Sequence, residues 1–207
     1  MLYKIRMPLA LARLGCTGVL VAINATVYLI FQLLPFDGKE FVEKWLALSR
    51  EGLMHGAVWQ LLTYQFLHAT LLHLVVNMLA LWFVGQFMAS ELGLRKFLIL
   101  YLLGGIVGGG LQLIFQGAEA VLVGASAAVC SVLIGFCTLY PHQRITALIF
   151  FIIPLQLTAK ALGWGIVVVS LILALIGWPP GIGNLAHLGG STFGFLVTRF
   201  WMRRGML

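Results

Sequence analysis

The run FLILYLLGGIVGGGLQLIF occupies residues 97–115 and contains no charged side chain. As a helix it rises about 28 Å, which is close to the thickness of the hydrocarbon core of a bilayer. Comparable apolar runs lie at residues 14–34, 72–90, 124–140, 160–177 and 185–202. The sequence therefore predicts an all-α membrane protein, a bundle of six transmembrane helices, with residues 1–207 forming a single domain.

The composition of the 207-residue chain also fits a lipid environment. Hydrophobic residues make up 61% and charged residues 9%, whereas a soluble domain carries about 25% charged residues. The net charge of +7 comes from scattered basic residues without a basic face, so no nucleic-acid partner is expected. Cys16, Cys130 and Cys137 lie in apolar runs and lack metal-binding spacing. No metal or other cofactor is expected.

Residues 35–71 form the only long polar stretch, between the first and second spans. This stretch mixes acidic and basic residues with aromatic residues such as Phe41, Trp45 and Trp59. Such a mixture is typical of the membrane–water interface. We therefore expect short interfacial helices here rather than a free linker.

The basic residues favour one orientation of the six spans, because cytoplasmic loops carry an excess of Lys and Arg. With the N-terminus inside, Lys39, Lys44 and Arg50 face outside. Ten basic residues then face the cytoplasm: Lys4, Arg6, Arg13, Arg95, Lys96, Arg144, Lys160, Arg199, Arg203 and Arg204. We expect a multi-pass protein of a bacterial cytoplasmic membrane, with both termini in the cytoplasm.

Residues 145–159 are apolar, but the segment is short and Pro154 interrupts it. A seventh span at this point would reverse the last helices and place Arg203 and Arg204 outside, against the charge bias. We therefore interpret the segment as a re-entrant or interfacial lead-in to the fifth span.

Polar residues collect at one end of the predicted bundle. The second, fourth and sixth spans run in the same direction, so their N-terminal ends share one side of the membrane. His73 and Asn77 open the second span, Ser126 opens the fourth, and His187 opens the sixth. Each has an ordinary explanation when taken alone, such as close helix packing for Ser126 or an interhelical clasp for the i,i+4 pair. Their conjunction at one depth favours a functional site.

The inventory of residues excludes several kinds of intramembrane chemistry. None of the five histidines stands in an H-E-x-x-H motif, so a metalloprotease is not supported. An aspartyl protease needs two intramembrane carboxyl groups, and Asp37 in the polar stretch is the only Asp. A solute transporter usually carries charged residues in mid-span, and none occurs here. The remaining catalytic arrangement is a Ser126–His187 dyad without a carboxylate.

Three motifs resemble those of the rhomboid family of intramembrane serine proteases. They are WQLLTYQFLHATLLHLVVN at residues 59–77, GASA at 124–127 and AHLGGSTFG at 186–194. Their order and spacing agree with the family from about residue 14 to residue 200. The resemblance implies a rhomboid-like bundle that cuts transmembrane segments of other membrane proteins within the lipid bilayer.

The resemblance also implies roles for the four polar residues. Ser126 is then the nucleophile and His187 the general base. His73 and Asn77 are then donors to the oxyanion, together with the backbone N–H of Ser126. The alternative function is a non-proteolytic rhomboid-like module that binds membrane proteins. The substrate and the oligomeric state stay open.

Several residues depart from the family pattern or bear on its assembly. Ala127 replaces a glycine, and Gln60 replaces an arginine, so the first loop is expected to be held differently. Cys130 stands where many members carry an aromatic ring that stacks on the catalytic histidine. We therefore expect a looser His187 with a weaker contact to Ser126. The Gly190-x-x-x-Gly194 pair predicts close approach of the sixth span to the fourth.

The segment Gly177–Asn184 joins the last two spans and is rich in Gly and Pro. Such a composition predicts a turn, and we also interpret the segment as a mobile lid next to His187.

Overall fold

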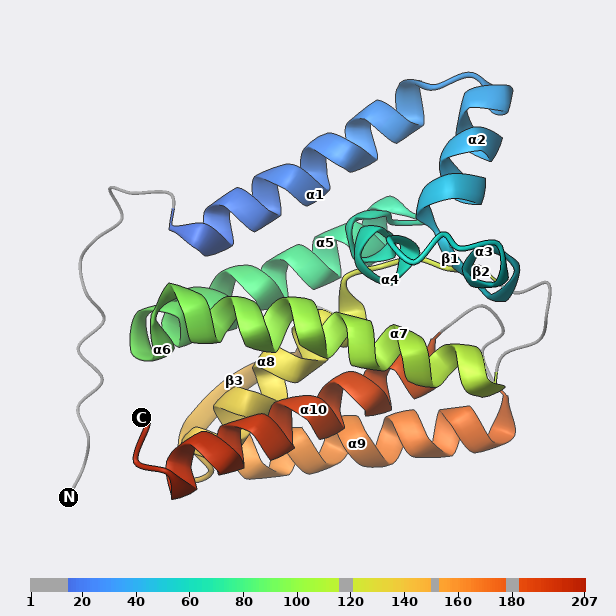
Figure 1. The fold of residues 1–207 in the computed structure, drawn as a ribbon. Coiled ribbons are helices and arrows are strands. Elements are labelled where there is room, and N and C mark those ends of the chain that lie inside the picture. Colours follow the sequence, from blue (N-terminus) through green and yellow to red (C-terminus); the bar gives the residue numbers. More distant parts are fainter. Residues whose placement is uncertain (1–14, 116–120, 150–152, 178–182) are drawn as a thin grey trace.

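The structure is a computed structural model that describes residues 15–115, 121–149, 153–177 and 183–207. Its described part consists of helices and two small antiparallel sheets, arranged as a bundle of roughly aligned helices (Figure 1). The first basic residues of the chain and most of the predicted lid lie outside the described residues. The order and direction of the spans therefore follow from the described helices.

The first span and the polar stretch have the expected character. Helix α1 covers Cys16–Leu33, close to the predicted range of 14–34. Short helices follow, as predicted for an interfacial segment: α2 at Phe36–Leu46, α3 at Arg50–Met54, α4 at Gln60–Thr63 and the 3₁₀ turn η1 at Tyr64–Phe66.

The second and third spans form one helical run, Leu71–Phe115, that folds back on itself. Its elements are α5 Leu71–Ala80, the π-helical η2 Leu81–Gly85, α6 Gln86–Leu98, the π-helical η3 Ile99–Leu103 and α7 Gly104–Phe115. The reversal occurs inside α6 at Gly93, where φ is 75° and ψ is 162°. Glycine adopts this conformation readily because it has no Cβ. Helices α5 and α7 consequently run in opposite directions (Figure 1).

The last three spans also lie close to their predicted positions. They are α8 at Ser126–Leu139, α9 at Ala159–Ile176 and α10 at Asn184–Arg203. Between α8 and α9, strands β3 (Arg144–Ile149) and β4 (Ile153–Thr158) pair as an antiparallel hairpin. The segment 145–159 is therefore a lead-in to the fifth span, as predicted. The strand pairing that shapes it was not predicted.

Within the described part of the chain, three helical stretches are long and apolar enough to cross a membrane: Cys16–Leu33, Leu71–Phe115 and Ala159–Ile176. The second has 45 residues and makes two passages, because the chain reverses at Gly93. Helix α8 is a shorter apolar helix. Helix α10 is less apolar because small and polar residues, among them Ser191 and Thr198, are buried where it packs on its neighbours. This arrangement is consistent with six passages.

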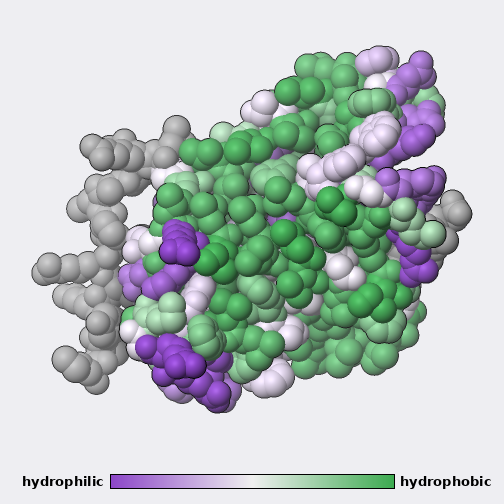
Figure 2. Space-filling view, in the orientation of Figure 1, coloured by the Kyte–Doolittle hydropathy of each residue, from purple (hydrophilic) through white to green (hydrophobic). Residues whose placement is uncertain are grey.

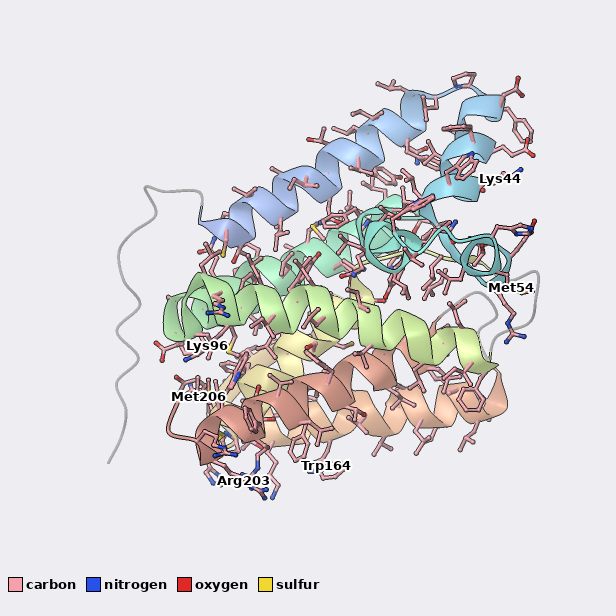
Figure 3. The ribbon with its side chains drawn as sticks, in the orientation of Figure 1. Lys44, Met54, Lys96, Trp164, Arg203 and Met206 are labelled. Carbon is pink, nitrogen blue, oxygen red and sulfur yellow. The ribbon has the colours of Figure 1, made fainter. Side chains whose placement is uncertain are left out.

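The surface is organised like that of a membrane protein. A broad hydrophobic belt covers the middle of the visible face, and hydrophilic residues gather at its two ends (Figure 2). One end is rich in basic residues and is called here the basic end; Lys96 and Arg203 lie there, whereas Lys44 lies at the opposite end (Figure 3). Helices α8 and α10 end at the basic end, and α9 begins there. The described basic residues of this end are Arg95, Lys96, Arg144, Lys160, Arg199, Arg203 and Arg204.

Candidate active site

Ser126 is the first residue of α8, and the polar stretch holds the segment that leads into it. Strand β1 (Leu48–Ser49) pairs with β2 (Val121–Leu122), which lies four residues before Ser126. The N–H of Gly124 donates to the carbonyl oxygen of Tyr64 at 2.9 Å. Tyr64 is buried, and its hydroxyl donates to the carbonyl oxygen of Gly105 in α7 at 2.6 Å. These contacts set the position of the Ser126 backbone.

His187 lies in the first turn of α10, which is held from two sides. Its backbone N–H donates to the carbonyl oxygen of Gly183 at 3.1 Å. The neighbouring N–H of Ala186 donates to the side-chain oxygen of Gln112 in α7 at 3.1 Å. A side chain of another helix therefore satisfies one of the free N–H groups that every helix start exposes.

Close packing of α10 on α8 brings Ser126 and His187 together. A methyl group at Gly190 would lie 2.1 Å from the carbonyl oxygen of Ala127, and one at Gly194 would lie 2.2 Å from that of Ser131. No larger residue fits at either position without movement of the helices. The predicted close approach of the Gly190-x-x-x-Gly194 pair to the fourth span is confirmed.

Helix α7 completes this junction, which the sequence reasoning missed. A methyl group at Gly108 would lie 2.5 Å from the carbonyl oxygen of Ala186 and 2.6 Å from Cβ of Ala127. Gly108 therefore touches the residues next to both His187 and Ser126. The cluster of glycines at residues 104–110 was an available signal for such a contact, because small residues allow helix backbones to approach.

The central feature of the site is a hydrogen bond between Nε2 of His187 and Oγ of Ser126, with a length of 2.8 Å. This distance is within the range required between a nucleophile and its base. When the proton of the neutral imidazole is on Nδ1, Nε2 accepts a hydrogen bond from the hydroxyl of Ser126. The two residues are 61 positions apart, so only the tertiary structure brings them into contact.

The prediction of a weak contact between Ser126 and His187 is wrong. Cys130, on which the prediction was based, does lie on the predicted face of α8. Its thiol is near the hydroxyl of Ser191, which is one turn beyond His187 in α10. The packing of α10 on α8 at Gly190 holds the histidine in place. An aromatic ring at position 130 is therefore not required for the hydrogen bond.

His73 lies beside the start of α8. A methyl group at Gly124, two residues before Ser126, would lie 2.5 Å from Cε1 of His73. Gly124 has φ 123°, so both its backbone and its lack of a side chain accommodate the imidazole. The structure thus brings His73 next to the segment that leads into Ser126.

Asn77 is buried one turn further along α5. Its side-chain N–H donates to the carbonyl oxygen of His73 in the same helix at 2.8 Å. The amide is therefore engaged within α5, and its role toward Ser126 stays a prediction.

His68 is a residue of this region that the sequence reasoning missed. It is buried, and the N–H of Ala125 approaches its Nε2 at 3.5 Å. Its ring packs edge-on against that of His73, with a centroid distance of 5.1 Å. Burial lowers the pKa of His68 to about 4, and the neighbouring His73 adds to this effect. His68 is therefore a neutral side chain of the polar stretch and lies next to Ala125, the residue before Ser126.

Gln60 holds the first loop through its side-chain amide. It is fully buried, and its side-chain oxygen accepts the N–H of Ser49 at 3.1 Å. Its side-chain N–H donates to the carbonyl oxygen of Lys44 at 2.9 Å. An uncharged amide thus joins the end of α2 to β1, which in turn pairs with the strand leading to Ser126.

The fold and the site together define a class: a multi-pass helical membrane protein with a hydrogen-bonded Ser–His pair at the starts of two packed helices. Comparison with known proteins gives the family. A model of the Rhomboid domain matches residues 55–204 of the chain. The chain belongs to the rhomboid family.

Its relatives come from plants and bacteria. RHOMBOID-like protein 4 of Arabidopsis thaliana is 34% identical over 67% of the chain, and RHOMBOID-like protein 1 of the same plant is 32% identical over 75%. Rhomboid protease GlpG of Yersinia pestis is 30% identical over 84% of the chain. The chain spans 33%, 38% and 59% of the length of these relatives.

Proposed function

We propose that the protein is an intramembrane serine endopeptidase that cuts transmembrane segments of other membrane proteins. In this proposal residues 1–207 form one catalytic unit, with Ser126 as the nucleophile and His187 as the general base. The observation that carries the proposal is the 2.8 Å hydrogen bond between Oγ of Ser126 and Nε2 of His187. Membership of the rhomboid family and the similarity to rhomboid protease GlpG support it.

In the first half of the proposed reaction, Oγ of Ser126 attacks the carbonyl carbon of the scissile peptide bond while His187 takes the hydroxyl proton. The tetrahedral intermediate carries a negative charge on the former carbonyl oxygen. The C–N bond then breaks, and His187 returns its proton to the leaving amine. The product is an acyl ester on Ser126.

In the second half, water attacks the ester carbonyl as His187 again takes a proton. The C–O bond to Ser126 breaks, and the proton returns to the serine. This sequence releases a carboxylate and an amine and restores the hydroxyl. In each half of the reaction His187 takes up one proton and releases it again, so its protonation state is the same at the start and at the end. A neutral histidine hydrogen-bonded to serine can do this.

His73, Asn77 and the N–H of Ser126 are the proposed donors to the oxyanion. The position of His73 against Gly124 supports its assignment. Ser126 is at the N-terminal end of α8, where free N–H groups and the helix dipole favour negative charge. For Asn77 the proposal requires its amide to leave the carbonyl of His73 and turn toward the intermediate.

The proposed activity is tested by reconstituting the purified protein in liposomes with a model transmembrane substrate. We expect cleavage by the wild type and a loss of about 10⁴-fold or more in Ser126→Ala and in His187→Ala. The matched controls are Ser90→Ala and His55→Ala, which change exposed residues away from the site. Wild-type protein that binds the substrate without cutting it would instead support the alternative, a non-proteolytic rhomboid-like binding module.

We also propose that the basic end of the bundle faces the cytoplasm, because positive charge is enriched on that side of membrane proteins. Labelling with a membrane-impermeant thiol reagent tests this orientation. Lys44→Cys should react from outside, and Arg203→Cys should react only after the membrane is opened; the reverse pattern would overturn the assignment. The bacterial cytoplasmic membrane expected from the sequence stays a prediction, since relatives also occur in a plant.

A further inference from the structure

A groove that contains neither Ser126 nor His187 lies between α8, α9 and α10. Its volume is about 530 Å³. The lining residues come from the last turns of α8 and the connection after it, the first turns of α9, and α10 from Ser191 to Arg199. The groove therefore occupies the half of the bundle that adjoins the basic end, away from the start of α8 where Ser126 lies.

The charged residues that line this groove lie at one end of it. Lys160 opens α9, and Arg199 is near the end of the antiparallel α10, so both cations line the groove at its outer end. His142, in the connection after α8, lines the same end. Deeper in the membrane, Trp164 lies one turn after Lys160, and Phe195 lies one turn before Arg199. The groove thus has a cationic mouth and an apolar body.

The apolar body is open to the side rather than enclosed. Trp164 is 62% exposed and Phe195 is 48% exposed, and Figure 3 places Trp164 on the outer side of the α9–α10 pair. In a membrane this side faces the acyl chains of lipids. A chain of the surrounding lipid can therefore enter the groove laterally while its headgroup stays at the interface.

We propose that this groove binds one anionic phospholipid, whose phosphate lies between Lys160 and Arg199 and whose acyl chain lies along Trp164 and Phe195. Guanidinium and ammonium groups are the usual protein partners of phosphate, and basic residues at a membrane surface attract anionic lipids. Tryptophan favours the headgroup level of the bilayer. None of the described residues that line the groove is acidic, so these residues do not favour the cationic group of a zwitterionic headgroup.

The volume of the groove is within the range of small-molecule sites. The two cations at its mouth favour a lipid with a phosphate headgroup over an uncharged transmembrane helix. The proposal is independent of proteolysis, because none of these residues belongs to the proposed catalytic machinery.

The proposal is tested by native mass spectrometry of the full-length protein, freed of lipid and titrated in detergent with phosphatidylglycerol or phosphatidylcholine. We expect saturable binding of one phosphatidylglycerol and much weaker binding of phosphatidylcholine. In Lys160→Gln/Arg199→Gln the affinity for phosphatidylglycerol should fall about 25-fold, because each basic residue near an anionic headgroup contributes roughly a five-fold factor. Thr192 lines the groove. Thr192→Trp places a large side chain in the groove without changing its charge and should abolish binding.

The matched control is Arg203→Gln/Arg204→Gln, which removes the same charge from the same end of the bundle outside the groove. This variant should bind phosphatidylglycerol like the wild type. An equal loss in both double variants would show diffuse attraction to the basic end and overturn the proposal. Equal binding of the two lipids, or displacement of phosphatidylglycerol by a transmembrane peptide, would overturn it as well.

Discussion

Gly190 of α10 lies directly against the carbonyl oxygen of Ala127 in α8, so close that a methyl group on Gly190 would be 2.1 Å from that oxygen. The two residues adjoin the site, since Ala127 follows Ser126 and Gly190 is three residues after His187. A backbone carbonyl cannot move aside as a flexible side chain can. The separation of these two helices therefore determines the distance between the serine and the histidine.

Gly190→Ala should push α10 away from α8 and lengthen the hydrogen bond between Ser126 and His187. We expect a loss of about 1–3 kcal/mol in stability from overpacking and a loss of about 10²-fold in turnover from misplacement of the histidine. Thermal unfolding in detergent and cleavage in liposomes measure the two effects. Gly165→Ala is the control, because a methyl group there meets nothing within 4 Å. Unchanged stability and turnover in Gly190→Ala would contradict this account.

Asn77→Ala should slow cleavage by about 10²–10³-fold while the protein stays folded, if the amide stabilises the oxyanion. Asn24→Ala is a close control. Asn24 is also buried, and its side-chain N–H donates to the carbonyl of Leu20 one turn back at 2.8 Å, as that of Asn77 does to His73. Turnover of both variants is compared with thermal stability. Equal behaviour of the two would assign Asn77 to the structure of α5 alone.

Cys130→Phe should destabilise the protein by about 1–3 kcal/mol and lower turnover, because the thiol lies near buried Ser191 between α8 and α10. This expectation reverses the one drawn from the family pattern, in which an aromatic ring restores a loose histidine. Cys130→Ala should keep most activity, since it retains a small side chain. A Cys130→Phe protein that is more active and equally stable would favour the original interpretation.

Acid should destabilise the fold through His68. Burial lowers its pKa in the folded state to about 4, whereas an unfolded histidine has a pKa near 6.5. Between pH 4 and pH 6.5 the unfolded chain therefore binds more protons than the folded protein. The contribution of His68 to stability is complete above about pH 6.5 and is lost as the pH falls toward 4. The loss is about 3 kcal/mol at most.

The measurement is the unfolding temperature of wild type and His68→Asn across this pH range. The variant should lose stability at neutral pH and show a shallower acid decline. His55→Gln alters an exposed histidine of the same polar stretch and should keep the wild-type profile. If the unfolding temperature of His68→Asn fell with acid as much as that of the wild type, groups other than His68 would cause the decline.

The sequence by itself determined the spans, because a bilayer requires about 20 apolar residues per helix and leaves no other way to satisfy backbone hydrogen bonds. It also located Ser126 and His187, since polar residues are costly inside a membrane and so stand out there. The pairing of β3 with β4 lay beyond this reasoning, because the apolar composition of these strands resembles that of a short helix.

The tertiary structure alone decided how the site is assembled. The contact of Gly108 with both Ala127 and Ala186, and the place of His68 beside Ala125, depend on packing between segments far apart in the chain. The same packing made the contact between Ser126 and His187 a full hydrogen bond despite Cys130. Sequence patterns report which side chains share a helix face. The distance between two helices depends on every side chain that separates them, and here glycines allow the backbones to touch.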